Sequence, residues 1–547
     1  MNSYTHPPVL VVGAGPVGLV AALTLLQNGI PVRIIKKDPN PRTGQRGSGI
    51  WPRSLELFNF LNVPDVNDLG KPALPIRTYK SGTLEPLKDT SMVPYMEPTP
   101  AIPFHSPKLI GQQLLDVVLR RHLEKFSCFV EAGTELRSFE QSDEGITAVL
   151  AKNEILETVH TKWMIGADGA KGIVRKQLGL TFLGETRDDI HMLIADICLK
   201  GTGLDRGVIG TDLEVSLHNP FLRPTDEVGE DGWQFIIFGH KLDISKIAQS
   251  EELIFESIAS IVPTEITFKK LVWVSEFRPN IRMVNKFSDG RVFVAGDAAH
   301  VHSPTGGQGL NSGIQDAFNL GWKIALVEKG LADKSLLETY TEERLPVISE
   351  MLDMTTSILN QVITTGNMIA RRSPKFYMLG INCRFSSIVL DEFVTPVEGK
   401  PINAYGVLDE GHLEAGDRAP DAPRLLHVRP GDSGETTLFS HYRPWYHTIF
   451  VFTPSAADAT PILTALESLN KSVVRTAVML PSSAPVAHVA CPADLVLLDQ
   501  GGHAYSAYLV EASQTKVFVI RPDGVVGAIA HGAEGVNKYF SKIFVDV

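Results

Sequence analysis

The chain opens on a pattern of apolar positions that changes period twice. Val9–Val12 is a short β-branched run, typical of a buried parallel strand. Apolar residues then recur at helical spacing from Leu19 to Leu26, and Gly29 suits the residue that ends a helix. Val32–Ile35 is a second β-branched run. The pattern therefore predicts a strand, a helix and a second strand within about thirty residues.

The turn between the first strand and the helix has the spacing G-x-G-x-x-G. In a β-α-β unit such glycines make a tight turn and let backbone N–H groups approach a pyrophosphate at the helix N-terminus. Dinucleotide binding is the favoured interpretation, and an unrelated tight turn is the alternative. An acid normally follows the second strand to contact the adenosine ribose, but Lys36 and Lys37 stand there, with Asp38 just beyond. The glycines of the turn are Gly13, Gly15 and Gly18.

The first apolar stretch also raises the question of a membrane span. Val9–Leu26 contains no charged side chain and is near the lower length limit for a spanning helix. Residues 1–8 carry no positive charge of the kind that flanks a signal anchor. The glycines and Pro16 would also interrupt such a helix. We therefore expect a buried strand and helix, and no membrane span.

Two further segments place an acidic residue at the carboxyl end of a predicted buried strand. Asp168 follows Trp163–Gly166, and Asp297 follows Val292–Ala295. An acid in this position can hold a chain of sugar-like hydroxyls. Beyond the second acid, Gly306–Gly309 presents consecutive N–H groups at the start of a predicted helix, an arrangement that accepts anions.

In order and spacing, these three motifs resemble the class of single-component FAD-dependent aromatic hydroxylases that includes para-hydroxybenzoate hydroxylase and phenol hydroxylase. The similarity covers roughly residues 9–350, and it includes Arg46 with Gly49-Ile50, Gln112 with Asp116, and Tyr340–Pro346. The resemblance implies an α/β fold. A Rossmann-type FAD-binding domain would be interleaved with a β-sheet substrate domain and followed by a thioredoxin-like C-terminal domain.

The resemblance also implies a role for each matching residue. The motif glycines would face the FAD pyrophosphate, Asp168 would contact both FAD and the nicotinamide cofactor, and Asp297 would bind the ribityl chain. Gly172 departs from the serine usual in the second motif, as Lys36 departs from the usual acid. Arg46, Gln112 and Arg175 are also compatible with ordinary surface positions. The expected cofactor-binding set is Gly13, Gly15, Gly18, Asp38, Arg46, Gln112, Asp168, Arg175, Asp297, Pro304, Gly307, Gly309, Leu310 and Asn311.

The implied activity is an FAD-dependent monooxygenase reaction. NAD(P)H would reduce FAD, and O2 would then give a flavin C4a-hydroperoxide that hydroxylates a small aromatic molecule, phenolic by preference, in secondary metabolism or aromatic catabolism. Epoxidation or oxidative rearrangement of a polyketide-like alkene stays open. A non-catalytic dinucleotide-binding protein is a remote alternative.

No catalytic base is identified from the sequence. Ser48 stands where the phenol hydroxylase branch has an acid, and the flavin-lining Pro304 and Gly307 are the favoured active-site positions. His300 and His302 have a metal-like spacing but no third ligand in view, so no metal site is predicted. Six residues in the expected substrate regions are each more often structural than catalytic: Tyr79, Tyr95, His105, His191, Trp233 and His240.

Composition shifts divide the chain into segments. Residues 416–423 are rich in Ala, Pro and Asp and suggest a linker, and Val517–Ile520 with Arg521–Gly524 suggests a hairpin. The predicted organisation is an FAD-binding part at 1–180 with Pro-rich substrate-side loops at 64–107, a substrate sheet at 181–280, a second FAD-binding part at 281–350, a helical connector at 351–405 and the thioredoxin-like domain at 406–547.

Charge and cysteine content exclude several classes of partner. The chain has 547 residues and a net charge of −11, so it lacks the overall basic character of a nucleic-acid-binding protein. Four cysteines lie far apart without a C-x-x-C pair, which favours a reducing compartment such as the cytoplasm. The expected partners are a small molecule and O2, and a homodimer stays open.

Overall fold

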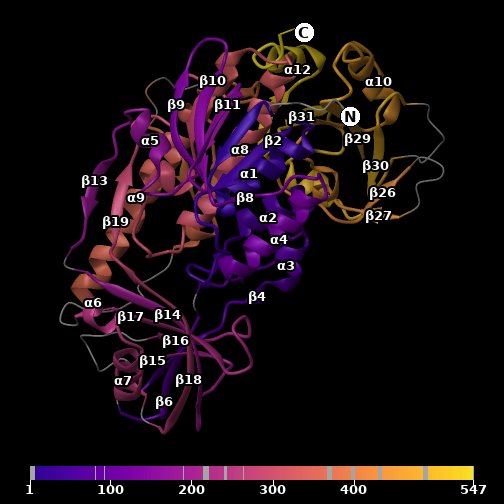
Figure 1. The fold of residues 1–547 in the computed structure, drawn as a ribbon. Helices are drawn as coiled ribbons and strands as arrows, with labels where there is room; N and C mark the ends of the chain where they lie inside the picture. Colours follow the sequence, from indigo (N-terminus) through magenta and orange to yellow (C-terminus); the bar gives the residue numbers. More distant parts are fainter. Residues whose placement is uncertain are drawn as a thin grey trace.

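The computed structural model describes residues 7–80, 82–91, 93–188, 190–212, 221–238, 243–262, 264–365, 373–395, 399, 401–428, 434–484 and 491–545. Three larger sheets organise these residues (Figure 1). A six-stranded sheet lies centrally, a seven-stranded sheet lies at the lower end of the view, and an eight-stranded sheet lies at the upper right.

The six-stranded sheet contains all three predicted motif strands. Its order is β20-β21-β12-β1-β2-β8, and every pairing is parallel except that of β20 with β21. The predicted β-α-β unit is confirmed, with α1 between the first two strands. The strands of this sheet and the helix are β1 (Val9–Val12), α1 (Pro16–Gln27), β2 (Val32–Lys36), β8 (Glu131–Ala132), β12 (Trp163–Gly166), β20 (Ser288–Asp289) and β21 (Val292–Val294).

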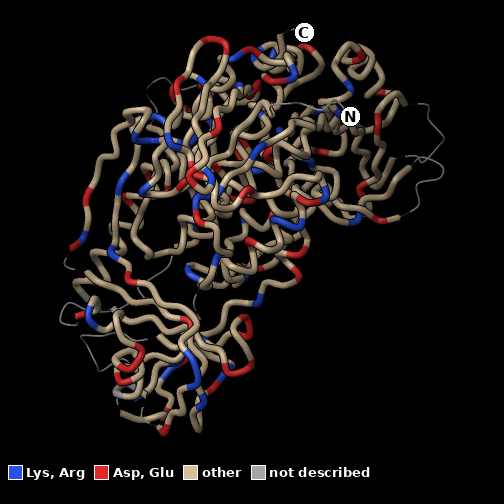
Figure 2. The backbone as a smooth tube through the Cα atoms, viewed as in Figure 1, with Lys and Arg blue, Asp and Glu red and all other residues tan. Residues whose placement is uncertain are grey.

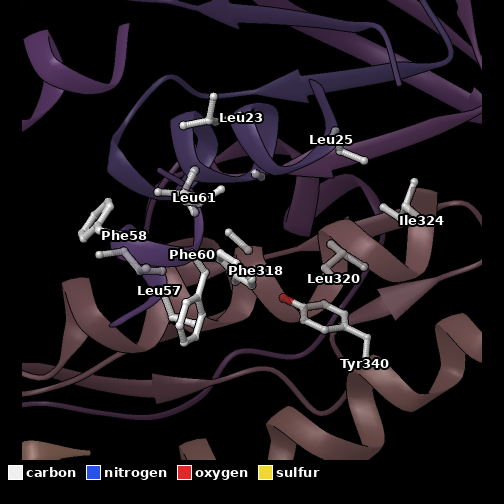
Figure 3. Close-up of a cluster of buried hydrophobic side chains, with 14 of the residues drawn as sticks. Leu23, Leu25, Leu57, Phe58, Phe60, Leu61, Phe318, Leu320, Ile324 and Tyr340 are labelled. Atoms are coloured by element: carbon white, nitrogen blue, oxygen red, sulfur yellow. The ribbon is translucent and has the colours of Figure 1, made fainter. Parts of the chain in front are cut away.

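Helices α2 (Pro52–Phe60), α8 (Gly309–Glu328) and α9 (Glu338–Thr365) build a core with α1. Gly321 allows α8 to lie close to α1, because a Cβ there would be 2.6 Å from the Thr24 methyl group. No helix among the described residues is both long and apolar enough to cross a bilayer. Figure 3 shows the converging side chains Leu23, Leu25, Leu57, Phe58, Phe60, Leu61, Phe318, Leu320, Ile324 and Tyr340.

The seven-stranded sheet has one face buried and one face turned toward the central domain. Leu193 and Ile197 alternate with Ile194 and Asp196 along β14, and the first pair packs against α6 (Ile244–Ile247) and α7 (Glu251–Ile261). The order is β18-β14-β17-β16-β15-β5-β6. The strands are β5 (Ile76–Tyr79), β6 (Pro86–Thr90), β14 (Met192–Gly201), β15 (Ile209–Asp212), β16 (Phe221–Pro224), β17 (Gly232–Phe238) and β18 (Ile266–Phe277).

Smaller elements are interspersed along the chain with the strands of these two sheets. A three-stranded antiparallel sheet, β9 (Thr134–Gln141), β10 (Ile146–Lys152) and β11 (Ile155–Thr161), precedes the second motif. The others are β3 (Gly49–Ile50), α3 (Asp65–Leu69), β4 (Lys71–Pro72), β7 (Lys108–Leu109), α4 (Gln112–Glu124), α5 (Ile173–Gln177), β13 (Leu183–Thr186), β19 (Asn280–Met283) and β22 (His300–Val301).

The C-terminal part forms a mixed sheet in the order β24-β32-β31-β28-β29-β30-β26-β27. The hairpin at Val517 is present as β31 and β32, and Gly524 takes φ +68° in its turn. The thioredoxin-like relationship stays a prediction. The elements are β24 (Leu390–Asp391), β26 (Leu425–His427), β27 (Glu435–Thr436), β28 (His447–Phe452), α10 (Ala456–Ala465), β29 (Val474–Pro481), β30 (Leu495–Asp499), α11 (His503–Ala507), β31 (Lys516–Ile520), β32 (Val526–Ala530) and α12 (Ala533–Phe540).

Two predicted segments differ from the structure. The boundary at residue 350 falls inside α9, and the described part of 351–405 beyond Thr365 contains a 3₁₀ turn at Pro374–Tyr377 and short strands, so a helical connector is wrong for that part. The predicted linker at 416–423 is also wrong. Its residues are largely buried, and Arg418 within it pairs with Glu56 of α2 at 2.6 Å.

A buried ionic cluster ties the C-terminal sheet to α8 and α9. Glu343 on α9 accepts hydrogen bonds from both terminal nitrogens of Arg521, at 2.7 and 2.9 Å, and from Lys323 on α8 at 2.8 Å. Arg521 also donates to Asp523 at 2.6 Å. Burial alone would raise the pKa of Glu343, but Arg521 and Lys323 hold that pKa well below its ordinary value. The carboxylate is therefore charged and fully partnered.

We predict that Arg521→Ala lowers the free energy of unfolding by about 3–5 kcal/mol, because it leaves the Glu343 carboxylate buried without its bidentate partner. Urea unfolding followed by circular dichroism measures the change. Arg384→Ala is the matched control. It removes a two-bond ion pair with Asp417 in a partly exposed position, for which we expect a loss below about 1 kcal/mol. Equal losses for the two variants would contradict the role of the cluster.

Candidate active site

A cleft of about 980 Å³ lies between the central sheet and the seven-stranded sheet. One wall is made by the residues that follow β1, β2, β12 and β21, all at the carboxyl ends of parallel strands. Ligands of open α/β sheets bind at this edge. The opposite wall belongs to β14 and β18 and includes Ile194, Trp273, Ser275 and Phe277.

The glycine turn at the end of β1 depends on close backbone approach. A Cβ on Gly13, which has φ +106°, would lie 2.2 Å from the carbonyl oxygen of Ala167. A Cβ on Gly18 would lie 1.9 Å from the carbonyl oxygen of Gly13. Gly13 and Gly15 line the cleft, whereas Gly18 does not and serves to pack α1 against the turn. The N-terminus of α1 therefore faces the cleft with its first amides available to an anion.

Positive charge gathers beside this turn. Arg42, which the sequence analysis missed, lines the cleft, and one of its terminal nitrogens would lie 3.2 Å from a Cβ on Gly15. Lys36 also lines the cleft and donates to the carbonyl of Asn40. Burial lowers the pKa of Lys36, and Asp38 opposes that shift. Asp38 and Glu135 line the cleft as well, and Figure 2 shows Lys and Arg interspersed with Asp and Glu along the chain in this view.

Asp168 follows β12 and caps the short helix α5. Its Oδ2 accepts from the amide of Val174 at 3.1 Å, and its Oδ1 has no partner. A Cβ on Gly172 would lie 2.1 Å from that Oδ1, so glycine in place of the expected serine makes room for the carboxylate. Burial raises the pKa of Asp168, partly offset by the amide of Val174. Asp168 lines the cleft, but its unpartnered Oδ1 is covered by protein atoms.

Arg175 does not line the cleft. Its guanidinium donates to the carbonyls of Ala298 at 2.9 Å and Ala170 at 2.7 Å, and it lies 3.8 Å from the centre of the Phe182 ring. The residue joins the second and third motifs behind the cleft wall. Its contacts hold these two segments together, and a contact of Arg175 with the cofactor stays a prediction.

Asp297 lies in a 3₁₀ turn directly after β21 (Gly296–Ala298). Protein atoms surround it on most sides and raise the pKa of its carboxyl, and His300, Arg42 and Arg46 oppose that shift. Its side chain nevertheless faces the open cleft. The carboxylate can accept from a polyhydroxyl chain that passes between the turn and the two arginines.

The turn that carries Asp297 is anchored by a fully buried carboxylate on α8. Asp316 accepts from the amide of Gly296 at 3.0 Å, from His300 at 2.8 Å and from Arg344 at 2.7 Å. Burial alone would raise the pKa of Asp316, but Arg344 and His300 lower it to about 2. The conformation of the third motif is thus fixed from behind by an ionised group.

The loop before α8 is held by side chains from distant segments. Trp51 donates through Nε1 to the carbonyl of Gly306 at 3.1 Å, and its backbone amide donates to Asn311 at 2.8 Å. Gln308 donates to Gly306 at 2.7 Å and accepts from Tyr405 at 2.6 Å. Asn311 therefore braces the loop and does not line the cleft, whereas Pro304, Gly307, Gly309 and Leu310 do.

His302 is a cleft-lining imidazole between the third motif and the loop. Its Nε2 would lie 2.5 Å from a Cβ on Gly309, so the glycine makes room for the ring. Burial and the neighbouring His300 lower the pKa of His302 to about 4. The ring is therefore uncharged at neutral pH.

The structure brings together most of the predicted cofactor-binding residues. Gly13, Gly15, Asp38, Arg46, Gln112, Asp168, Asp297, Pro304, Gly307, Gly309 and Leu310 line one cleft, and Gly18, Arg175 and Asn311 support it from behind. None of Tyr79, Tyr95, His105, His191 and Trp233 lines it, and His240 lies outside the described residues. No cluster that could hold a metal ion occurs in the described parts of the chain.

These features fit a flavin dinucleotide. The turn at Gly13 and Gly15 would let phosphates approach the backbone, and Arg42 and Lys36 would supply compensating charge. Asp168 and Asp297 line the cleft, and the free amides of the first turn of α8 would face a flat ring, whereas the Gly307 amide donates to the carbonyl of Pro304. All of these groups line one cleft of about 980 Å³.

We predict that Asp297→Ala weakens FAD binding at least about tenfold, because it removes a carboxylate acceptor inside the cleft. Titration of apoprotein with FAD, followed by flavin fluorescence, measures the dissociation constant. Asp289→Ala is the control, since Asp289 lies on the neighbouring strand β20 and pairs with Lys286 at the surface. Unchanged affinity in Asp297→Ala would contradict the role given to this residue.

Comparisons with known proteins agree with this geometry. Residues 6–355 match the family model described as FAD binding domain. A flavin-dependent monooxygenase of Mycobacteroides abscessus is 30% identical over 545 residues, which is 98% of this chain and 99% of the relative. Pentachlorophenol 4-monooxygenase of Sphingobium chlorophenolicum is 32% identical over 443 residues, 77% of each protein. The ternary complex of aklavinone-11 hydroxylase with FAD and aklavinone superposes with a TM-score of 0.79 at 23% identity, covering 99% of each chain.

The family model spans well over half of the chain, and the first relative spans nearly all of it. The predicted resemblance, the fold class and FAD as the cofactor are confirmed, and the non-catalytic alternative is set aside. The chain belongs to the FAD-binding-domain family of flavin-dependent monooxygenases.

Proposed function

We propose that the protein uses NAD(P)H and O2 to hydroxylate a flat aromatic molecule, and we favour a phenol as the substrate. The substrate would bind between the flavin and the seven-stranded sheet. The observation that carries this proposal is the apolar character of the sheet face that closes the cleft. Names of relatives support the substrate class, since pentachlorophenol and aklavinone are aromatic. The cofactor-binding residues proposed are the predicted ones that line the cleft, with Arg42 added.

The apolar face is a row of cross-strand neighbours. Phe221 on β16 pairs with Ile236 on β17, Ile236 pairs with Ile194 on β14, and Ile194 pairs with Ser275 on β18. Directly opposed residues share one face of a sheet, and Ile194 and Ser275 line the cleft. All four are half-buried, unlike the fully buried residues on the other face. Phe221 and Ile236 extend the same face of the sheet beyond these two cleft-lining residues, so the row places aliphatic and aromatic side chains beside the cleft.

The chain's own residues divide the work of the reaction. Bound FAD supplies the electron transfer and the activation of oxygen. The glycine turn, Arg42 and Asp297 would fix the position of the dinucleotide. The amides at the start of α8 would stabilise negative charge at the edge of the ring system that they face. The apolar row, Phe221, Ile236, Ile194 and Ser275, would orient the substrate and exclude water. Neutral His302 would offer a hydrogen-bond acceptor within the cleft.

The cellular location proposed is the cytoplasm. Cys128, Cys198 and Cys383 carry free thiols, as expected in a reducing compartment.

The proposal predicts that purified protein is yellow and oxidises NAD(P)H faster when a phenol is added. A panel of mono- and polycyclic phenols, with polyenes of similar size, tests the substrate class by the change in absorbance of the reduced nicotinamide. Hydroxylated product is then identified by mass spectrometry. Stimulation by polyenes alone, with epoxide as product, would contradict the aromatic assignment and favour the alkene chemistry.

We further predict that Ile194→Asp raises the KM for the best phenol about tenfold or more, because it places a charge on the apolar row. The flavin content, read from visible absorbance, should be unchanged. Leu87→Asp is the control. It puts the same charge on an exposed position of β6 in the same sheet, and its KM should match the parent enzyme. An unchanged KM in Ile194→Asp would contradict substrate binding at the row.

A further inference from the structure

A second row of cross-strand neighbours lies beside the apolar row and contacts the loop Gly44–Gly47. Trp273 on β18 pairs with Asp196 on β14, Asp196 pairs with Gln234 on β17, and Gln234 pairs with Arg223 on β16. Each member lies two positions from a member of the apolar row and therefore on the same face. The loop itself belongs to the FAD-binding part of the chain and carries Arg46 into the cleft.

Asp196 makes the central contact of this row. Its side chain is fully buried, and its two oxygens accept from the backbone amide of Gln45 at 2.7 Å and from the Gln45 side chain at 2.9 Å. The Gln45 side chain is also fully buried, and its oxygen accepts from Arg223 and Thr225, each at 3.0 Å. Every polar atom at the end of the Gln45 side chain is therefore bonded to the seven-stranded sheet.

The two flanking members of the row hold the loop on either side. Gln234 donates to the backbone carbonyl of Arg46 at 3.2 Å. A Cβ on Gly44, which has φ +86°, would lie 2.3 Å from the Trp273 ring, so the glycine allows the indole to lie against the loop. The Trp273 ring also lies 5.4 Å from the Arg46 guanidinium carbon. The loop Gly44–Gly47 thus contacts one row member on each of the four strands β18, β14, β17 and β16.

The backbone of Arg46 explains why such support is needed. Its φ of +53° is in the left-handed region, which costs a residue with a side chain about 1 kcal/mol or more. Two sets of hydrogen bonds stabilise that conformation. Gln45, the residue before Arg46, donates to Asp196, and the backbone carbonyl of Arg46 accepts from Gln234. Without them the loop would relax, and the guanidinium would leave its position near Asp297 and Arg42.

We propose that Asp196 is a positioning residue that, through Gln45, holds Arg46 at the cofactor, so that the substrate sheet sets the geometry of FAD binding. This inference rests on the proposed contact between Arg46 and FAD. Asp196 itself touches neither cofactor nor substrate. A ligand on the apolar row and the Arg46 loop would then be linked through one rigid sheet face.

The test is a double-mutant cycle on FAD affinity, measured by flavin fluorescence during titration of apoprotein. We expect Asp196→Asn to weaken FAD binding about tenfold to a hundredfold, because the new amide group places a donor against the donors of Gln45. Arg46→Ala should weaken binding to a similar extent. The double variant should bind FAD no more weakly than Arg46→Ala alone, since Asp196 affects FAD binding only through Arg46.

Several outcomes would overturn the inference. Asp196 has no positioning role if the losses of FAD affinity in the two single variants add. The same conclusion follows if Asp196→Asn binds FAD normally while Arg46→Ala does not. If Arg46→Ala itself binds FAD normally, the underlying cofactor contact of Arg46 fails instead. Gln45→Ala, which keeps the backbone and Asp196, replaces Asp196→Asn in the cycle if that variant does not fold.

Asp226→Asn is the matched control, since Asp226 is an exposed acid beside the same sheet that pairs only at the surface with Arg206. It should bind FAD as the parent protein does. Weakened binding in this control would show that any loss of charge near the sheet has the same effect, and it would remove the case for Asp196.

Discussion

The contact between the glycine turn and the second motif is the constraint on which the cleft depends. No side chain could fit between Gly13 and the carbonyl of Ala167, or between Gly18 and the carbonyl of Gly13. These approaches bring β1, α1 and β12 together so that the carboxyl ends of the two strands and the N-terminus of the helix open on one space. Asp168 and Asp297, far apart along the chain, can then face the same ligand. A single Cβ in the turn would separate the parts that bind the dinucleotide.

Around this constraint, the structure relies on buried charges that are fully paired. Asp316 fixes the turn that presents Asp297, and Glu343 joins the C-terminal sheet to the helices behind the cleft. An unpaired carboxylate at either place would be costly, so each arrangement tolerates little displacement. The C-terminal part is thereby packed as a support for α8 and α9, without lining the described cleft.

The sequence predicted the local features well because their signals lie within short windows. The β-α-β unit, the acid after each strand and the start of α8 all depend on neighbouring residues, and all are present. The sequence could not separate residues that line the cleft from those that brace it. Gly18, Arg175 and Asn311 belong to the motifs, yet their side chains or Cβ positions meet other protein segments. Arg42 lines the cleft without belonging to any motif.

The wall opposite the cofactor was beyond sequence reasoning for a different reason. The rows through Asp196 and Ile194 are perpendicular to their strands, so neighbours in space come from segments tens of residues apart. Strand periodicity indicates which residues share a face, but only register decides which of them meet across strands. In the proposed function, substrate binding and cofactor positioning would use adjacent rows of one face. A change that shifts register in this sheet would therefore alter both together, whereas a change on its α7-covered face would act first on stability.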